Sequence, residues 1–218
     1  MKELRNIIRP CLVATLCCII MMPMLATAQS DAADETALRL LAEKFLDNFQ
    51  KEDANGVMAL WSDKSPHIAI NQQSLQQTFS SLDQIELKAI TIRYLSARDG
   101  RAMLRVAAEM SAVDAKTGLP AEGLGKIHRT LHFISEDGKW KIQQYLVSEE
   151  DLAHALVVAQ TEQEQDALLK DDKELQTVEL RKALIKHGEN LIEERKMPQA
   201  LTIFGSVAKI ILPTTCRA

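Results

Sequence analysis

The sequence predicts an α+β protein in which N-terminal helices precede an antiparallel sheet and an α-helical hairpin ends the chain. Two changes in the spacing of apolar residues carry this prediction. Apolar side chains recur every three or four positions before residue 82 and again after residue 148, which is the period of a helix with one buried face. Between these segments they alternate with polar side chains, as in a strand with one face in a core. Strands and helices do not alternate along the chain, so a parallel nucleotide-binding sheet is not expected.

Three helices are expected at the start of the globular part. Residues 36–50 are apolar at every third or fourth position, which predicts a long amphipathic helix. Asp53 is placed to cap a short second helix, and Pro66 ends that unit. The Gln-rich segment 72–82 keeps the helical spacing and predicts a third helix.

A four-strand antiparallel meander follows these helices. Residues 104–112 alternate regularly between the two faces of a strand. Asp99 and Gly100 form a tight-turn signal that joins this strand to the preceding one as a hairpin. Asp137 and Gly138 provide the turn between the last two strands. The four strands are expected over residues 86–97, 104–112, 126–135 and 139–147.

The last third of the chain is predicted to be helical. Its composition shifts to Ala, Leu, Glu, Gln, Asp and Lys, with residues 149–180 expected as a helical linker and residues 181–214 as a hairpin of two helices. Five residues are expected where those two helices cross, small ones that allow a close approach and larger ones that fill the seam. They are Gly188, Ala200, Leu184, Leu191 and Phe204.

The composition is that of a folded globular protein, with 46% hydrophobic and 26% charged residues in a chain of 218, which excludes a disordered chain or a coiled-coil rod. Lys and Arg number 26 against 30 Asp and Glu, which gives a formal net charge of -4. Because binding to nucleic acid depends on neutralising phosphates with Lys and Arg, no nucleic-acid partner is expected.

The first 28 residues have the features of a secretory signal peptide. Basic residues precede the apolar run Cys11–Leu25, which is followed by the small-residue site Ala-Thr-Ala. The run is shorter than the roughly 20 residues that a membrane-spanning helix needs. We therefore expect an exported protein, periplasmic or secreted, that is cleaved after Ala28 and has no stable membrane insertion afterwards. Cleavage would leave Cys216 as the only cysteine, so no internal disulfide is expected.

Three helices followed by a meander with Gly138, Trp140 and Ile142 in its last hairpin resemble the nuclear transport factor 2-like superfamily, which includes the polyketide-cyclase-like (SnoaL-like) domains. The resemblance covers about residues 34–148, within an expected domain at 29–148. It implies a cone-shaped fold, in which a curved sheet wraps against the long first helix with a pocket between them. The superfamily contains both enzymes and binding proteins, so the resemblance does not decide the chemistry of the pocket.

Residues 181–214 are similar to a tetratricopeptide repeat, a 34-residue helix hairpin. The five crossing residues occupy positions of that motif, whereas His187 stands where an apolar residue is usual. The order of leader, cone domain, linker and repeat resembles the N-terminal part of secreted bacterial tetratricopeptide proteins that sometimes end in a caspase-like (CHAT) peptidase domain. No peptidase residues carry over to this chain. The resemblance implies either a truncated relative of a longer repeat protein, or a lone hairpin that caps the cone or pairs with another chain.

Few residues point to chemistry. His128, His132, Arg105 and Glu109 are candidates for polar or acid-base groups in the cone pocket, and the alternative is an exposed strand face. The two histidines are about 13 Å apart along a strand, too far to share one metal ion. Trp61 is a further pocket candidate, and its alternative is a core aromatic. No phosphate-binding loop, nucleophile motif or metal motif is present in the sequence, so no catalytic residue, metal or cofactor is expected.

Two functions follow from this interpretation. The first is an exported, noncatalytic scaffold or protein-interaction module that binds a protein partner, or a second copy of itself, through its helical tail. The alternative is a small-molecule-binding protein or enzyme that uses the cone pocket. The direction of the His128 and His132 imidazoles distinguishes the two, because the enzyme needs them in the cavity between the sheet and the first helix.

Overall fold

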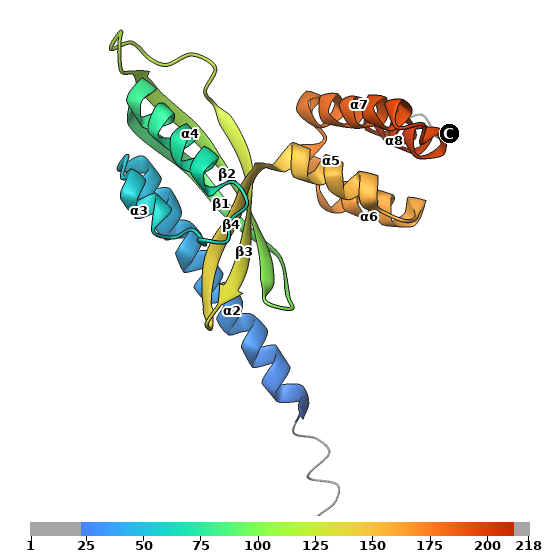
Figure 1. The fold of residues 1–218 in the computed structure, drawn as a ribbon, viewed down its shortest axis with the longest axis horizontal. Helices are drawn as coiled ribbons and strands as arrows, with labels where there is room; N and C mark the ends of the chain where they lie inside the picture. Colours follow the sequence, from blue (N-terminus) through green and yellow to red (C-terminus); the bar gives the residue numbers. More distant parts are fainter. Residues whose placement is uncertain (1–22, 212–218) are drawn as a thin grey trace, which may run out of the picture.

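The computed structural model describes residues 23–211 and, within them, the side chains of residues 34–210. Most of the expected leader and Cys216 lie outside the described residues. Within that range no helix is long and apolar enough to cross a membrane. The elements are α2 (Pro23–Gln50), α3 (Ala54–Met58), α4 (Ile68–Ser81), β1 (Leu82–Arg98), β2 (Arg101–Asp114), β3 (Lys126–Glu136), β4 (Lys139–Val147), α5 (Ser148–Val158), α6 (Glu162–Asp171), the 3-10 turn η1 (Lys173–Leu175), α7 (Val178–Glu193) and α8 (Met197–Ile211) (Figure 1).

The predicted α+β class is confirmed, and the four strands form one antiparallel sheet in the order β1-β2-β3-β4. Asp99 and Gly100 both have positive φ angles, 53° and 69°, as the tight turn between β1 and β2 requires. Asp137 and Gly138 repeat this geometry between β3 and β4, with φ angles of 50° and 74°. The turn residues therefore determine where the chain reverses.

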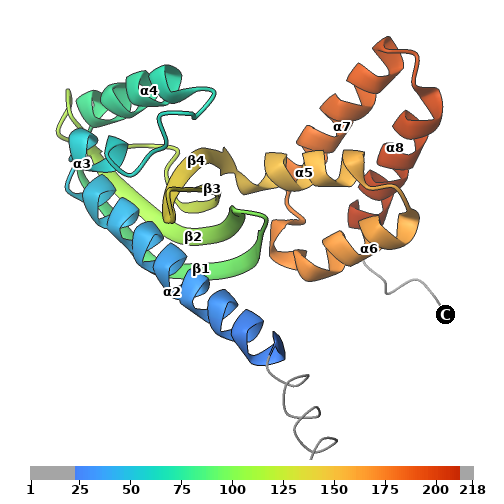
Figure 2. The same ribbon diagram turned by 60° about the horizontal axis from the view of Figure 1, so that its bottom comes forward.

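Several boundaries differ from the prediction. α2 begins at Pro23 rather than at residue 36, and β2 spans Arg101–Asp114 rather than residues 104–112. α4 begins at Ile68 rather than at residue 72. Pro66 disfavours helix only in the residue before it, so the residues after it can be helical. β1 begins at Leu82 and contains three register shifts, including one between Lys88 and Thr91. Such bulges interrupt the alternation that marks a strand in the sequence, and they bend the sheet. The curvature of the sheet is visible in Figure 2.

The core of the cone lies between α2 and one face of the sheet, called here the inner face. Leu104, Leu131, Phe133 and Ile142 point to this side and are almost fully buried, and Leu38 of α2 packs against the same cluster. The Asp53 side chain accepts a hydrogen bond from the Gly56 main-chain nitrogen at 2.8 Å, which confirms the predicted cap of α3. The sheet lies between α2, α3 and α4 on one side and the helical tail on the other (Figure 2).

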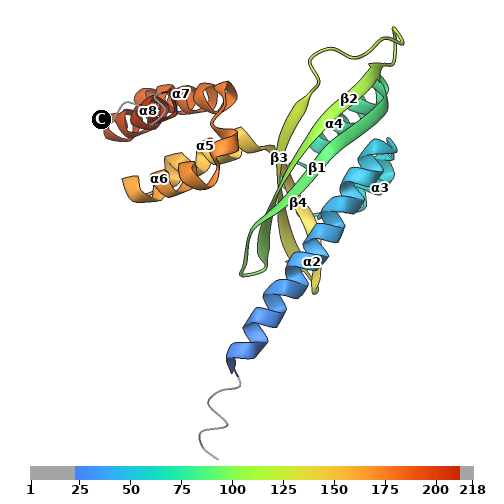
Figure 3. The ribbon, with the colours of Figure 1, turned by 180° about the vertical axis from the view of Figure 1, so that it is seen from behind.

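The tail, α5 to α8, has a hydrophobic core of its own. Leu152 and Leu156 of α5 share this core with Leu180 and Leu184 of α7 and with Ile203 of α8. The segment expected as a linker thus packs together with the hairpin rather than extending away from it. Figure 3 shows the tail on the side of the sheet away from α2.

The predicted crossing residues meet where α7 and α8 pack. Leu184 and Ala200 are fully buried, Leu191 is 9% exposed, and Gly188 is buried against the ring of Phe204. A Cβ atom built on Gly188 would lie 2.6 Å from two ring carbons of Phe204, which is closer than carbon atoms approach without rearrangement. Glycine at this position is therefore a packing requirement.

His187, the residue that departs from the repeat motif, is half-buried beside α5. Its burial lowers the pKa of the imidazole below the usual value of 6.5, and the nearby His154 and Lys186 lower the pKa further, while Glu150 acts in the opposite direction. The folded tail therefore favours the neutral imidazole at this position.

Candidate functional site

A small cavity lies inside the cone, between α2, α3, α4 and β4, with a volume of about 120 Å³. α4 forms its outer wall, and none of the residues of this helix is fully buried. The cavity is lined by Phe45, Phe49, Val57, Met58, Trp61, Asn71, Ser74, Leu75, Thr78 and Tyr145.

Aromatic rings form a continuous wall along this cavity. The ring centroid of Tyr145 is 5.2 Å from that of Phe45, which is 6.4 Å from that of Phe49. Phe49 in turn lies 5.3 Å from Phe79 of α4. These separations are those of favourable aromatic pairs, so the wall is apolar.

Trp61 reaches the cavity because the segment after α3 pairs with the edge of the sheet. The main-chain nitrogen of Ser62 donates to the carbonyl of Ile142 at 2.8 Å, and the nitrogen of Ile142 donates to the carbonyl of Leu60 at 2.9 Å. The Trp61 side chain is only 6% exposed, and its indole Nε1 is buried with no hydrogen-bond partner. A buried donor without a partner is uncommon in a folded protein.

The polar groups of this lining are uncharged. Tyr145 is its only titratable residue, and burial raises the pKa of its phenol above 10, against a smaller opposing effect of the positive charge of Arg129. The guanidinium carbon of Arg129 lies 5.8 Å from the centre of the Tyr145 ring. The phenol therefore stays protonated at neutral pH. Among the described residues of the lining there is no carboxylate, imidazole or amine.

Most of the sequence-predicted site residues lie on the other side of the sheet, called here the outer face. His128, His132 and Arg105 alternate along their strands with inner-face residues such as Leu104 and Leu131, so their side chains point away from the cone cavity. They are not on an exposed face either, because α5 covers them. The prediction that they line the cone pocket therefore differs from the structure, and Trp61 is the one candidate that lines it.

Glu109, the fifth candidate, is exposed and lies apart from both groups. It is paired in register with Lys126 and Lys88 of the neighbouring strands. Cross-strand pairing with two lysines accounts for a carboxylate at this position.

The outer-face histidines meet the acidic first turn of α5. His128 Nδ1 lies 2.8 Å from Glu149 Oε1, and His132 Nε2 lies 2.9 Å from Asp151 Oδ1. The Thr130 hydroxyl, between the two histidines, is 3.0 Å from the Ser148 hydroxyl. α5 begins directly after β4, and these contacts place its first turn against this face of the sheet. Carboxylates at a helix N-terminus are also favoured by the helix dipole.

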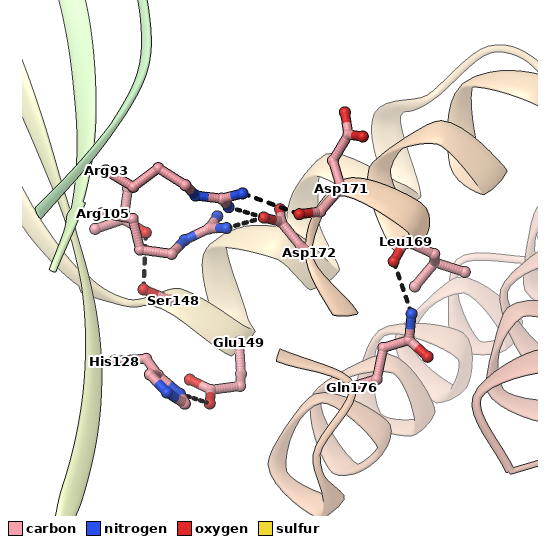
Figure 4. A network of polar contacts seen from close by, with 10 residues as sticks. Arg93, Arg105, His128, Ser148, Glu149, Leu169, Asp171, Asp172 and Gln176 are labelled. Carbon is pink, nitrogen blue, oxygen red and sulfur yellow. Dashed lines mark hydrogen bonds and ion pairs between the residues drawn. The ribbon is translucent and has the colours of Figure 1, made fainter. Parts of the chain in front are cut away.

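A second polar contact joins the outer face to the end of α6. Arg93 and Arg105 stand opposite each other on β1 and β2, and both donate to the same oxygen of Asp172. Arg93 also donates to the main-chain carbonyl of Asp171 at 2.9 Å. Figure 4 shows both guanidinium groups directed at Asp172. Two like charges on opposite strands repel each other, and the carboxylate between them compensates for this.

Sequence reasoning missed the contacts of Arg93, Asp172 and Glu149 on the outer face. It also missed that Tyr145 lines the cone cavity. One available signal was the acidic run at residues 149–151, which follows directly on the strand that pairs with the histidines. No local pattern connects Arg93 with Asp172, which are 79 positions apart.

The fold and the cavity together define a class of protein: an α+β cone in which a curved antiparallel sheet and a long helix enclose a small apolar pocket. Residues 38–149 match the model of a family described as SnoaL-like domain. This match spans half of the chain, and the protein belongs to the SnoaL-like domain family.

Several solved structures are similar to part of this chain at low sequence identity. A ketosteroid isomerase-like protein from Erwinia carotovora atroseptica is 15% identical, with 50% of this chain and 91% of that chain covered and a TM-score of 0.43. A conserved protein from Planctomyces limnophilus is 17% identical, with coverages of 52% and 94% and a TM-score of 0.41. An NTF2-like protein with a cystatin-like fold from Novosphingobium aromaticivorans is 14% identical, with coverages of 56% and 84% and a TM-score of 0.40. A search of curated proteins found no match.

Proposed function

We propose that the cone domain is a noncatalytic binding domain for a small, uncharged, mostly apolar molecule of about the size of one aromatic ring. The observation that carries this proposal is the lining of the cone cavity, which combines an aromatic wall with uncharged polar groups. Ligand sites in proteins are typically apolar pockets with a few polar groups that fix orientation.

The buried indole N–H of Trp61 supports a ligand that accepts a hydrogen bond. Leaving a buried donor without a partner costs about 1–3 kcal/mol, so a ligand oxygen that reaches Nε1 would recover part of this cost. The volume of about 120 Å³ limits the ligand unless α4 moves. Movement of α4 has a physical basis, because this helix buries none of its residues fully.

The same lining argues for binding over proton-transfer catalysis. A general acid or base must lie within hydrogen-bond reach of the reacting group and have a pKa near the working pH. Tyr145, with its raised pKa, is a hydrogen-bond donor at neutral pH rather than a base. The histidines that an enzyme would need lie on the outer face, paired with Glu149 and Asp151.

Nuclear magnetic resonance tests this proposal with the two tryptophans of the chain. The Trp140 indole nitrogen donates to Asp34 at 3.0 Å, whereas Trp61 Nε1 has no partner. Titration with phenol is expected to shift the Trp61 indole N–H resonance saturably and to leave that of Trp140 unchanged, and benzoate is expected to shift neither. The Trp140→Phe variant assigns the two signals.

A matched pair of variants on α4 provides the control. Leu75→Phe fills the cavity from its outer wall and is expected to weaken phenol binding by about tenfold or more. Gln76→Phe places the same ring on the exposed side of the helix and is expected to have no effect. Equal effects of the two variants, or equal binding of benzoate, would contradict the proposal.

A second candidate function, a scaffold that assembles through the tail, is favoured by an apolar stripe on α7. Val178, Ile185 and Ile192 are spaced by seven residues, so they lie along one side of the helix, and they are 47%, 41% and 42% exposed. We propose that this stripe pairs with the same stripe of a second copy. Apolar residues repeated every seven positions on an exposed helix face are typical of helix pairing.

Export is proposed together with this assembly. The basis of this proposal is the leader-like sequence of residues 1–28. The last residues of this segment belong to α2, because that helix begins at Pro23. After cleavage the helix would begin at Gln29, still well before Leu38, its first core residue.

Native mass spectrometry of the protein recovered from the periplasm of a Gram-negative host tests both points. We expect a chain that begins at Gln29 and forms a dimer, and we expect Ile185→Glu to convert it to a monomer. Leu119→Glu is the control and should leave the dimer intact, because Leu119 is a more exposed apolar residue, 64% against 41% for Ile185, in the loop between β2 and β3. A monomeric wild type would rule out self-assembly, and an intact residue 1 would rule out cleavage.

A further inference from the structure

We propose that the cleft between the outer face of the sheet and the tail binds a small organic carboxylate with an apolar body. The cleft has a volume of about 600 Å³, within the range of roughly 300–1,000 Å³ typical of small-molecule sites. It lies on the opposite side of the sheet from the cone cavity, so this site is independent of the proposed function above. β1, β2 and β3 form one wall, and α5 and α6 form the other.

The end of the cleft at Arg93 and Arg105 carries a surplus of positive charge. Both guanidinium groups bind one oxygen of the single carboxylate of Asp172. Asp171 contributes its main-chain carbonyl to Arg93, and its carboxylate points away from both arginines (Figure 4). Two positive charges thus face one negative charge, which leaves the site able to accept another anion.

The hydrogen-bonding capacity of the two arginines is also incomplete. The Nε atoms of Arg93 and Arg105 are both buried and have no hydrogen-bond partner. Arg105 is only 5% exposed, so water does not replace the missing partner easily. A carboxylate is the group that guanidinium binds most specifically, through two parallel hydrogen bonds.

Two further carboxylates, those of Asp151 and Asp171, line the cleft, and the Asp171 carboxylate points away from both arginines (Figure 4). Asp151 of α5 is paired across the cleft with His132 of β3, at 2.9 Å between Oδ1 and Nε2, so this carboxylate already has a hydrogen-bond partner. His154 of α5 also lines the cleft and carries no negative charge in either protonation state.

The walls beyond the arginines are mainly apolar. They include Leu95, Met103, Leu152, Val158 and Leu168. An inorganic anion would leave this surface in contact with water, whereas an alkyl or aryl chain would cover it. The combination of a guanidinium pair at one end and aliphatic side chains along the walls favours an amphipathic carboxylate.

Calorimetric titration with octanoate, and with octanamide as its uncharged counterpart, tests the proposal on the whole protein. We expect saturable binding of octanoate and at least about tenfold weaker binding of octanamide. Arg93→Gln is expected to weaken octanoate binding by about tenfold or more. Arg93 is the less buried of the two arginines, with 41% of its side chain exposed, so the fold should tolerate this change.

Arg129→Gln is the matched control. It removes the same charge from the inner face beside Tyr145, next to the cone cavity, and is expected to leave octanoate binding unchanged. Octanoate binding that is lost in Arg129→Gln and kept in Arg93→Gln would overturn the proposal, as would equal affinity for octanamide or the absence of saturation. Phenol binding in the cone cavity is expected to be the same in Arg93→Gln and wild type, so failure of one site does not imply failure of the other.

A second measurement does not depend on variants. Intermolecular nuclear Overhauser effects are expected between the octanoate chain and the methyl groups of Met103 and Leu152. Contacts to the methyl group of Met58, which lines the cone cavity, would place the ligand in the other site and overturn the proposal.

Discussion

Gly188→Leu is expected to destabilise the helical tail by about 1–3 kcal/mol and to leave the cone folded. A Cβ atom at this position already lies 2.6 Å from the Phe204 ring, and a leucine side chain adds three more carbons to the same seam. α7 and α8 would have to separate, which would open the core around Leu184 and Ile203. Hydrogen exchange of α7 and α8, measured beside that of the strands, checks this expectation.

Two further variants show whether the cause is packing. Gly205 lies in α8, and a Cβ atom added there would meet no atom within 4 Å, so Gly205→Ala is expected to stabilise the tail by up to about 1 kcal/mol through helix propensity alone. Phe204→Leu removes the ring that Gly188 contacts. In a protein that also carries Gly188→Ala, Phe204→Leu should recover part of the stability that Gly188→Ala alone loses. Unchanged exchange in Gly188→Leu would show that the two helices do not depend on this contact.

Asp172→Ala is expected to have the largest effect, a loss of about 3–5 kcal/mol from the free energy of unfolding. The variant leaves Arg105, which is 5% exposed, without its carboxylate and places two guanidinium groups opposite each other without compensation. The tail should then separate from the sheet before either part unfolds. Chemical denaturation and limited proteolysis between β4 and α5 measure this loss.

Asp171→Ala is the control for this variant. It removes a neighbouring carboxylate that points away from the arginines, and it keeps the main-chain carbonyl that Arg93 binds. Its effect is expected to stay within about 0.5 kcal/mol, as for most surface substitutions. Equal effects of the two variants would mean that the net charge of the tail matters, rather than the buried contact.

The elements of this protein were largely predictable because local chemistry defines them. Asp53 caps α3, and the Asp-Gly pairs at 99–100 and 137–138 make the two hairpin turns where the sequence places them. β1 was the least predictable strand, since its bulges interrupt the alternation of side chains. Such bulges are the means by which the sheet curves around α2, and they respond to tertiary packing.

The site was predicted less well than the fold. Alternation correctly placed His128 and His132 on one face of β3, and the neighbouring Leu131 and Phe133 on the other. Since the apolar pair belongs to the core, the histidines had to face away from it, and this conclusion was available from the sequence. The helix that covers them was not, because nothing local indicates that α5 turns back over the sheet.

The sequence by itself determined the order of helices and strands and the turns, since each depends on neighbours a few positions apart. Only the tertiary structure decided that Trp61 and Tyr145 meet in one cavity and that Arg93 and Arg105 share Asp172. Those groups come from segments up to 84 positions apart in the chain, and their encounter depends on how the sheet curves and how the tail docks. Local spacing carries no information about either.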